Sequence, residues 1–238
     1  MMSLKKAVIL SAGLGTRLMP LTADRPKVMV PVKGRPLLEH HLEWLRGYGI
    51  TQFYVNLHAH PESIPAYFSD GRDMGVEIHY FYEPQLRGTA GALHGFASQF
   101  GEPFLVHYGD VYSQLAVDQM ADVHFSSQAI ATLAVHTSKH PEDSDIVEMD
   151  AEGRVIGLHH KPKSRRFGIT GNAACYILQP EILSYLDESV LAEDFIVDVF
   201  PRALAAGHRL QTFTNRNLMM DMGTLDRYSE IERILSNQ

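Results

Sequence analysis

The chain has 238 residues, of which 45% are hydrophobic and 21% are charged, and its formal net charge at pH 7 is −7. This composition is that of an ordinary soluble protein long enough for one large α/β domain, and its negative charge argues against a basic nucleic-acid-binding surface. No apolar run approaches the roughly 20 residues of a membrane span, so we expect neither nucleic acid nor membrane as a partner. The single cysteine, Cys175, and an N-terminus without the apolar stretch of a signal peptide predict a cytoplasmic protein.

Strand-like and helix-like segments alternate through the first half of the chain. The continuous apolar run at 6–10 is typical of a parallel strand buried on both faces. The segment 36–49 predicts a helix, because its apolar residues recur on one face and Pro36 stands at its start. Further strands are expected at 52–57, 76–82 and 103–109, with helical crossovers at 60–70, 89–100 and 115–127. This alternation predicts an α/β fold with a doubly wound, mostly parallel Rossmann-like sheet.

The second half of the chain has a different pattern. After a strand at 129–136, the segment 145–164 predicts a β-hairpin that turns at 150–153. A strand and a proline-started helix follow in 170–183, then a helix and strand in 193–213, and a closing helix at 223–238. No change of composition marks a linker. We therefore expect one domain, 1–238, whose second half is a β-rich insertion and cap on the sheet.

A glycine-containing loop follows the first strand, with the sequence SAGLGTRL at 11–18. It does not match a dinucleotide-binding motif, because Leu18 stands where the third glycine belongs, and it lacks the Gly-Lys-Ser/Thr of a P-loop. Small residues at 11–13 would nevertheless let the backbone approach a ligand closely and form an anion-binding nest. Arg17 could fork onto phosphate oxygens, and Lys27 could add a point charge. The alternative is a glycine turn flanked by solvated cations.

Two aspartates stand at places where an open α/β sheet binds ligands. Asp110 follows the apolar strand at 103–109, and Asp221 follows a second apolar run and precedes a glycine. Magnesium is held in proteins by one or two carboxylates together with phosphate oxygens and water. Each aspartate alone is as well explained as a turn or cap residue. Beside the loop at 11–18 and its cations, the pair predicts a metal–nucleotide site.

The segment 13–40, GLGTRLMPLTADRPKVMVPVKGRPLLEH, resembles the signature of the sugar-1-phosphate nucleotidylyltransferases. The resemblance continues in order through 83–93, 109–110, 161–162, 171–178, 198–204 and 221–228. In look, the chain is most similar to single-domain mannose- or heptose-1-phosphate guanylyltransferases. The resemblance implies a Rossmann-like fold, with nucleotide binding in about 1–135 and sugar binding in about 136–238. It also implies an enzyme that transfers a nucleoside monophosphate from an NTP to a sugar 1-phosphate, using Mg²⁺ and releasing pyrophosphate.

The resemblance also implies roles for individual residues. Those expected to contact the nucleotide are Ser11, Ala12, Gly13, Gly15, Thr16, Arg17, Lys27, Glu83 and Gly88. Those expected to contact the sugar phosphate are His160, Lys161, Asn172 and Ala174. Arg17, Lys27 and Asp110 would be catalytic, and Asp110 and Asp221 would hold the metal. No general base is required, because a phosphate monoester with a second pKa near ~6 is already largely dianionic at neutral pH.

The chain departs from the family pattern mainly on the sugar side. His160-Lys161 stands where the family has Glu-Lys, and Asn172-Ala173-Ala174 stands where it has Asn-x-Gly. These changes remove a carboxylate and add a methyl group. We expect either an acceptor other than the commonest hexose phosphates or a catalytically weakened homologue.

Other readings of the sequence stay open. The segments 87–91 and 198–204 favour guanylyl transfer, whereas Ser-Ala-Gly at 11–13 favours uridylyl or cytidylyl transfer, and thymidylyl transfer is a further alternative. A rival class is a nucleotide-sugar-binding regulatory subunit without activity, which has no need of both aspartates. A Rossmann dehydrogenase is disfavoured by Leu18. A homo-oligomer is compatible with the sequence. The histidines, His160 excepted, and Cys175 are expected on the surface or in the core.

Overall fold

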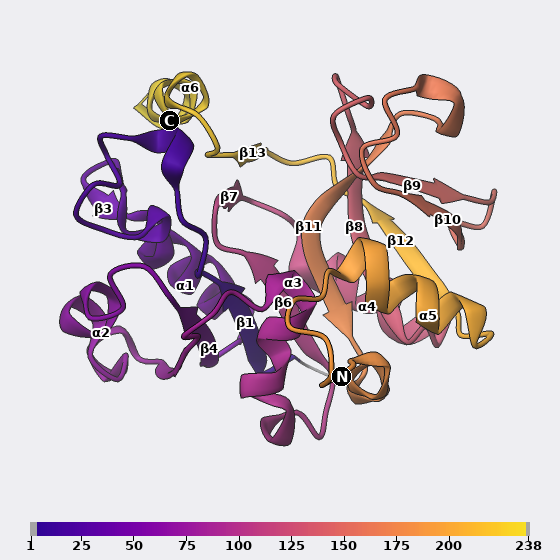
Figure 1. Ribbon diagram of the computed structural model, residues 1–238, viewed down its shortest axis with the longest axis horizontal. Helices are drawn as coiled ribbons and strands as arrows, with labels where there is room; N and C mark the ends of the chain where they lie inside the picture. Colours follow the sequence, from indigo (N-terminus) through magenta and orange to yellow (C-terminus); the bar gives the residue numbers. More distant parts are fainter. Residues whose placement is uncertain (1–3, 237–238) are drawn as a thin grey trace. The chain divides into compact units, whose positions relative to one another are not determined.

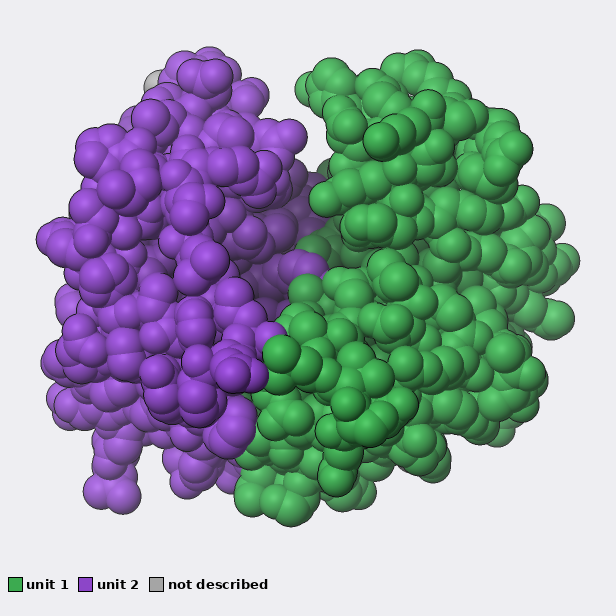
Figure 2. Space-filling model, in the orientation of Figure 1, with its two compact units in different colours: residues 1–4, 87–106, 116–216 green, residues 5–86, 107–115, 217–238 purple. Residues whose placement is uncertain are grey.

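The computed structural model describes residues 4–236, whose helices and strands are labelled in Figure 1. The predicted closing helix at 223–238 corresponds to α6, Leu225–Ser236, and residues 237 and 238 lie outside the described part, as do residues 1–3 of the N-terminal stretch. The described residues form two compact units (Figure 2). Unit 1 contains 87–106 and 116–216 together with residue 4, and unit 2 contains 5–86, 107–115 and 217–236. No described helix is long and apolar enough to cross a membrane.

Unit 2 contains the parallel strands that the sequence predicts. In it, β1 pairs with β4 and β4 pairs with β5, both in parallel; their bounds are Lys6–Leu10, Gln52–Leu57 and Glu77–Tyr82. Helices α1 and α2 span Leu37–Gly47 and Ser63–Phe68. Two short antiparallel pairs complete the unit: β2 with β3, Pro31–Val32 and Arg35–Pro36, and β7 with β13, Val111–Ser113 and Met219–Asp221. Strand β6, Phe104–Tyr108, contributes its last two residues to this unit.

A hydrophobic cluster joins sequence-distant parts of unit 2. Its buried side chains come from the segment between β1 and β2, from β2, from the start of α1, from the residue after β13 and from α6, namely Leu18, Val30, Val32, Leu37, Met222, Ile231 and Leu235. Burial of a large aliphatic side chain contributes about 1.5–3 kcal/mol. The cluster therefore holds both the glycine loop and the segment around residue 221 to one core.

Unit 1 is built on the long strand β11, Thr170–Leu178. Strands β8 and β9 pair with β11, and β10 pairs with β9, all antiparallel, whereas β12 pairs with β8 in parallel. The bounds of these four strands are Ala131–Thr137, Ile146–Met149, Val155–His159 and Leu210–Thr214. The helices are α3, α4 and α5, spanning Gly88–Gly91, Val117–Ser127 and Phe200–Ala205. The predicted hairpin at 145–164 is confirmed by β9 and β10.

Three predicted helices differ in the structure. The crossover at 89–100 is broken into α3 and two 3₁₀ turns, Ala92–Gly95 and Ala97–Gln99, because glycines at 88, 91 and 95 weaken a continuous helix. The helix predicted within 193–213 begins as a π-helical segment, Phe195–Val199. Pro201 has no N–H for the carbonyl of Val197, so the regular i→i+4 ladder cannot continue there. The proline-started helix at 180 is a 3₁₀ helix, Pro180–Tyr185.

Strand β11 contains a bulge that carries one of the predicted sugar-site residues. Its register against β8 shifts between Asn172 and Tyr176, and Ala174 within the bulge has a φ of 53°. A left-handed conformation costs an L-residue roughly 1–2 kcal/mol, whereas glycine adopts it readily. The structure therefore uses alanine at a position whose backbone favours glycine.

We expect Ala174→Gly to raise the free energy of unfolding by up to about 1 kcal/mol, because the relief of the left-handed strain exceeds the added entropy of the unfolded chain. Urea unfolding of the two proteins measures the difference. Ala173→Gly is the matched control: Ala173 is buried and its φ is not positive, so that variant should be destabilised. A loss of stability in Ala174→Gly as large as in the control would contradict the strain.

Candidate active site

The loop after β1 is fixed to the neighbouring strands by a chain of buried polar groups. The backbone N–H of Ser11 donates to Oδ1 of Asn56 at 2.6 Å, and Nδ2 of Asn56 donates to Oε1 of Glu83 at 2.9 Å. Glu83 is fully buried. It therefore reaches the loop through Asn56, which the sequence analysis missed. The available signal was a single amide at the end of the apolar strand 52–57, where parallel strands present their ligand-binding ends.

Glycine at positions 15 and 13 has different structural explanations. Gly15 has a φ of 66°, and a Cβ there would lie 2.9 Å from Cγ2 of Thr22, whose hydroxyl donates to the Gly15 carbonyl at 2.8 Å. A Cβ on Gly13 would meet no atom within 4 Å. Packing therefore requires glycine at 15, while Gly13 leaves space open above an exposed part of the loop.

The two ends of the turn Thr16–Leu18 face different surroundings. Leu18 is fully buried in the hydrophobic cluster of unit 2, which explains why the third glycine of a dinucleotide motif is absent. Arg17 is exposed and forms no ion pair with a carboxylate in the part of the chain that the structure describes. The loop thus presents one unpaired guanidinium next to buried apolar packing.

Lys27 lies beside the loop and is paired with both predicted metal ligands. It begins a 3₁₀ turn, Lys27–Met29, after Pro26, and its side chain is 9% exposed. Its Nζ lies 2.7 Å from Oδ2 of Asp110 and 3.8 Å from Oδ1 of Asp221. A buried ammonium must be paired with opposite charge, and here two carboxylates supply it.

The two aspartates are brought together by the short β7–β13 pair. Asp221 is opposite Val111 in that pair, and the N–H of Met222 donates to the carbonyl of Asp110 at 2.8 Å. A Cβ on Gly223 would lie 2.8 Å from both carboxylate oxygens of Asp221, so glycine leaves room for that carboxylate. The structure thus brings Asp110 and Asp221 together in unit 2.

Arg227 is a further cation at this place. It lies in the first turn of α6, and its Nη1 contacts Oδ2 of Asp221. Oδ1 of Asp221 is buried and accepts no hydrogen bond from the described residues. The sequence analysis missed Arg227, although a basic residue in the first turn of a helix that follows an aspartate is a readable signal. Two carboxylates and two cations therefore alternate in unit 2.

In unit 1, three of the predicted sugar-site residues are joined through Asp145. Nδ1 of His160 lies 2.7 Å from Oδ1 of Asp145, and the N–H of Asn172 donates to the Asp145 carbonyl at 2.8 Å. Oδ1 of Asn172 accepts from the N–H of Ala174 at 3.1 Å. Lys161 is exposed beside this group, with a φ of 38°. Asp145 was not predicted, and it supplies a carboxylate next to the position where the chain has histidine in place of glutamate.

Gly88 also lies in unit 1, where it packs against Glu193. Its φ is 77°, and a Cβ there would lie 2.3 Å from the carbonyl oxygen of Glu193. The same oxygen accepts from the N–H groups of Ala90 and Gly91, at 2.9 and 3.3 Å. Close packing is therefore sufficient reason for glycine at 88, and its contact with a base stays a prediction.

Comparison with known protein families shows to which family the chain belongs. The family described as Nucleotidyl transferase matches residues 6–238. The chain belongs to the nucleotidyl transferase family. Its relatives include the UTP–glucose-1-phosphate uridylyltransferase of Synechocystis, 31% identical over 98% of this chain, and the mannose-1-phosphate guanylyltransferase of Mycobacterium tuberculosis, 32% identical over 92%. The chain spans 64% and 61% of the lengths of these two relatives.

Solved structures of nucleotidyl transferases confirm the predicted fold class. A UTP-bound UGPase from Acinetobacter baumannii has a TM-score of 0.85 at 22% identity, with 98% of this chain and 93% of that chain covered. A UDP-glucose pyrophosphorylase complexed with UDP-glucose has a TM-score of 0.84 at 20% identity, with 98% and 99% covered. The α/β, Rossmann-like architecture and the family resemblance drawn from the sequence are therefore both correct.

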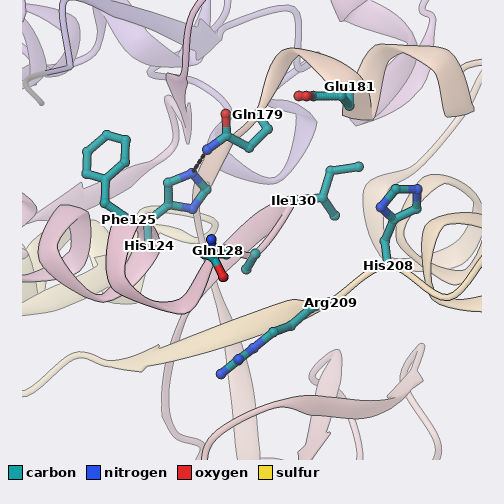
Figure 3. A pocket seen from close by; sticks show the side chains of 9 residues that line it. His124, Phe125, Gln128, Ile130, Gln179, Glu181, His208 and Arg209 are labelled. Carbon is teal, nitrogen blue, oxygen red and sulfur yellow. Dashed lines mark hydrogen bonds between the residues drawn. The ribbon is translucent and has the colours of Figure 1, made fainter.

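A separate pocket in unit 1 is lined by none of the predicted site residues (Figure 3). It holds about 400 Å³ and is lined by His124, Phe125, Gln128, Ala129, Ile130, Gln179, Glu181, His208 and Arg209. Both ring nitrogens of His124 are engaged: Nε2 accepts from Nε2 of Gln179 and Nδ1 donates to Oγ1 of Thr132, each at 2.9 Å. Burial lowers the pKa of His124 to about 4, so this histidine is a neutral structural group.

We expect Asn56→Leu to lower the free energy of unfolding by about 1–3 kcal/mol, because it removes one donor from the buried Glu83 carboxylate and the acceptor of the Ser11 N–H. Urea unfolding gives the value. Asn217→Leu is the control, since Asn217 is exposed where it donates to the Gln114 carbonyl, and its loss should cost less than 1 kcal/mol. Equal effects of the two substitutions would show that the buried chain of hydrogen bonds does not stabilise the loop.

Proposed function

We propose that the chain catalyses the transfer of a nucleoside monophosphate from a nucleoside triphosphate to a sugar 1-phosphate, with release of pyrophosphate. The observation that carries this proposal is the buried ammonium of Lys27 between Asp110 and Asp221, beside Gly15 of the loop after β1. The sugar-1-phosphate activities named for the relatives support it. Cations next to oxygen ligands are the groups that a triphosphate and its metal require, which supports the proposal.

The residues of unit 2 fit a magnesium ion. Carboxylate oxygens are the ligands that magnesium prefers. Oδ1 of Asp221 is buried and accepts no hydrogen bond from the described residues, because Nζ of Lys27, at 3.8 Å, is too far away to donate one. Asp110 and Asp221 would hold the ion. When bound, magnesium neutralises charge on phosphate oxygens.

The reaction would be an in-line displacement. A phosphate oxygen of the sugar 1-phosphate forms a bond to the α-phosphorus of the NTP, and the bond from that phosphorus to the oxygen bridging to the β-phosphorus breaks. Backbone N–H groups of 12–15 and the fork of Arg17 would bind the phosphates, and Lys27 would stabilise the charge that develops. The attacking oxygen is already ionised at neutral pH, so positioning supplies most of the catalysis.

The base and the acceptor are separate parts of the proposal. We propose guanylyl transfer, supported by the sequences at 87–91 and 198–204; uridylyl, thymidylyl and cytidylyl transfer are the alternatives. The relatives support no choice, since those named for uridylyl and guanylyl transfer match at 31% and 32% identity. Cytoplasmic location and a homo-oligomer stay predictions.

A regulatory subunit without catalytic activity is the second candidate function, favoured by the departures at His160 and Ala174. Against it stands the retention of both aspartates around a buried lysine, which binding of a finished nucleotide sugar does not require.

The test of the proposal is pyrophosphate release with each of four NTPs and a panel of sugar 1-phosphates in the presence of Mg²⁺. One NTP should be preferred, and EDTA should abolish release. Asp110→Asn and Asp221→Asn should each lower turnover by at least about 100-fold with the fold retained, since each removes a charge from the metal ligands. Asp226→Asn, at an exposed acid on α6, is the matched control and should keep full activity. Absence of release with every pair would favour the regulatory subunit.

The acceptor is tested through the contact of His160 with Asp145. We expect His160→Glu combined with Asp145→Asn to shift kcat/KM toward glucose or mannose 1-phosphate by about tenfold, because a carboxylate accepts hydrogen bonds from sugar hydroxyls where histidine offers a single acceptor at most. The second substitution prevents repulsion between two adjacent carboxylates. Asp145→Asn alone is the control. An acceptor profile that is unchanged in the double variant would refute a specificity role for His160.

A further inference from the structure

Two buried histidines lie behind Asp110 in unit 2. His41 comes from α1 and His107 from β6, and their side chains are 1% and 0% exposed. Their rings meet edge to face, with centroids 4.7 Å apart, and the ring of Trp44 packs against His107 at 5.2 Å. The pair is thus enclosed by aromatic packing and has no contact with solvent.

Each histidine binds a backbone carbonyl on one side of Asp110. Nε2 of His41 donates to the carbonyl of Gly109 at 2.9 Å, and Nε2 of His107 donates to the carbonyl of Val111 at 2.8 Å. Burial lowers the pKa of His107 to about 4 and that of His41 well below its usual value. Both rings are therefore neutral at pH 7, with the single proton on the nitrogen that faces the carbonyl.

The backbone at Asp110 is held from several directions at once. The carbonyl of Asp110 itself accepts from the N–H of Met222, between the two carbonyls that the histidines bind. On the other side, a Cβ at Gly109 would lie 2.7 Å from Cγ1 of Val28 and 2.8 Å from the carbonyl of Leu10. Three consecutive carbonyls are thus fixed by groups from α1, from β6 and from the segment after β13.

The histidine at 107 is an unfavourable choice for packing alone. Its Nδ1 is buried and has no hydrogen-bond partner among the described residues. An unpaired buried nitrogen destabilises the folded state, and a leucine of similar size would avoid it. The hydrogen bond from Nε2 of His107 to the Val111 carbonyl offsets the cost of this unpaired nitrogen.

We propose that His41 and His107 are positioning residues that fix the backbone on both sides of Asp110, so that its carboxylate is held in place for a divalent cation. The inference rests on the proposed function, because it assigns the cation to Asp110 and Asp221. Loss of either hydrogen bond should allow the Asp110 carboxylate to move and weaken the metal site, as the loss of groups that orient metal ligands does by about 10–100-fold in affinity.

The experiment measures Mn²⁺ binding by electron paramagnetic resonance in the presence of an NTP analogue. The analogue is the non-hydrolysable form of whichever NTP the protein prefers in the pyrophosphate-release assay. His107→Leu and His41→Leu should each raise the Mn²⁺ dissociation constant about tenfold. His107→Gln and His41→Gln, which keep an N–H near the position of Nε2, should recover most of the affinity. In activity assays, the leucine variants should lower kcat and raise the Mg²⁺ requirement, with KM for the sugar 1-phosphate unchanged.

His124 provides a matched control in unit 1. It is fully buried and hydrogen-bonded like His107, and it lies in the wall of the separate pocket (Figure 3). His124→Leu should destabilise the fold and leave Mn²⁺ affinity unchanged. If a leucine variant fails to fold by circular dichroism, His107→Asn replaces it, because asparagine fits the space but is too short to reach the Val111 carbonyl.

The outcomes separate this inference from the proposed function. Mn²⁺ binding by the unsubstituted protein with equal affinity in the histidine variants would overturn the positioning role and leave the proposed function intact. An equal weakening by His124→Leu would also overturn it, since the effect would then follow stability. Absence of Mn²⁺ binding by the unsubstituted protein would overturn both the metal site and the positioning role.

Discussion

The ammonium of Lys27 is the charge around which unit 2 is organised. A lysine whose side chain is 9% exposed needs partners, because an unpaired buried charge is strongly destabilising. Its partners, Asp110 and Asp221, lie at the same end of a short antiparallel pair of strands, one on each strand's side of the pair. Pairing this one cation therefore requires that the glycine loop, the end of β6 and the segment before α6 fold together. The same contacts gather the cations and oxygens that a metal–triphosphate complex would meet.

Much of the fold follows from local patterns in the sequence. The runs at 6–10, 52–57 and 76–82 are parallel strands, the first two largely buried, and the amphipathic segment at 36–49 is α1. Burial on one or two faces of an element leaves such a trace in the sequence. The break in the predicted helix 89–100 at residue 92 and the π-helical segment before Pro201 are less visible in the sequence. They depend on how glycines and a proline act within otherwise helical composition, where tertiary contacts decide between competing helical forms.

Residues of the candidate site can be predicted from the sequence where charged side chains stand in a recognisable motif. Arg17, Lys27, Asp110 and Asp221 stand out in this way, and the structure brings the last three together. Asn56, Arg227 and Asp145 could not be found by motif, because each acts through a contact that exists only after folding. His41 lies on the buried face of α1, and its hydrogen bond is formed with Gly109, in the turn after β6 and distant in sequence.

The residues predicted to bind the sugar show how a departure from a family pattern can be partly offset by the fold. Replacement of glutamate by His160 removes a carboxylate from the sequence motif, yet Asp145 lies within 2.7 Å of the imidazole. Charge and hydrogen-bonding capacity are therefore redistributed between two elements. Motif comparison alone records only the loss.

The discontinuous make-up of unit 2 has a consequence for synthesis on the ribosome. Its segments 5–86 and 107–115 are translated before 116–216 of unit 1, whereas 217–236 is translated after that stretch. A nascent chain that ends before residue 217 lacks Asp221, Arg227 and the apolar residues of α6 that cover Leu18. Such a chain holds Lys27 with Asp110 alone and an uncovered core. The contacts that pair Lys27 with both aspartates and cover Leu18 therefore form only once α6 has been translated.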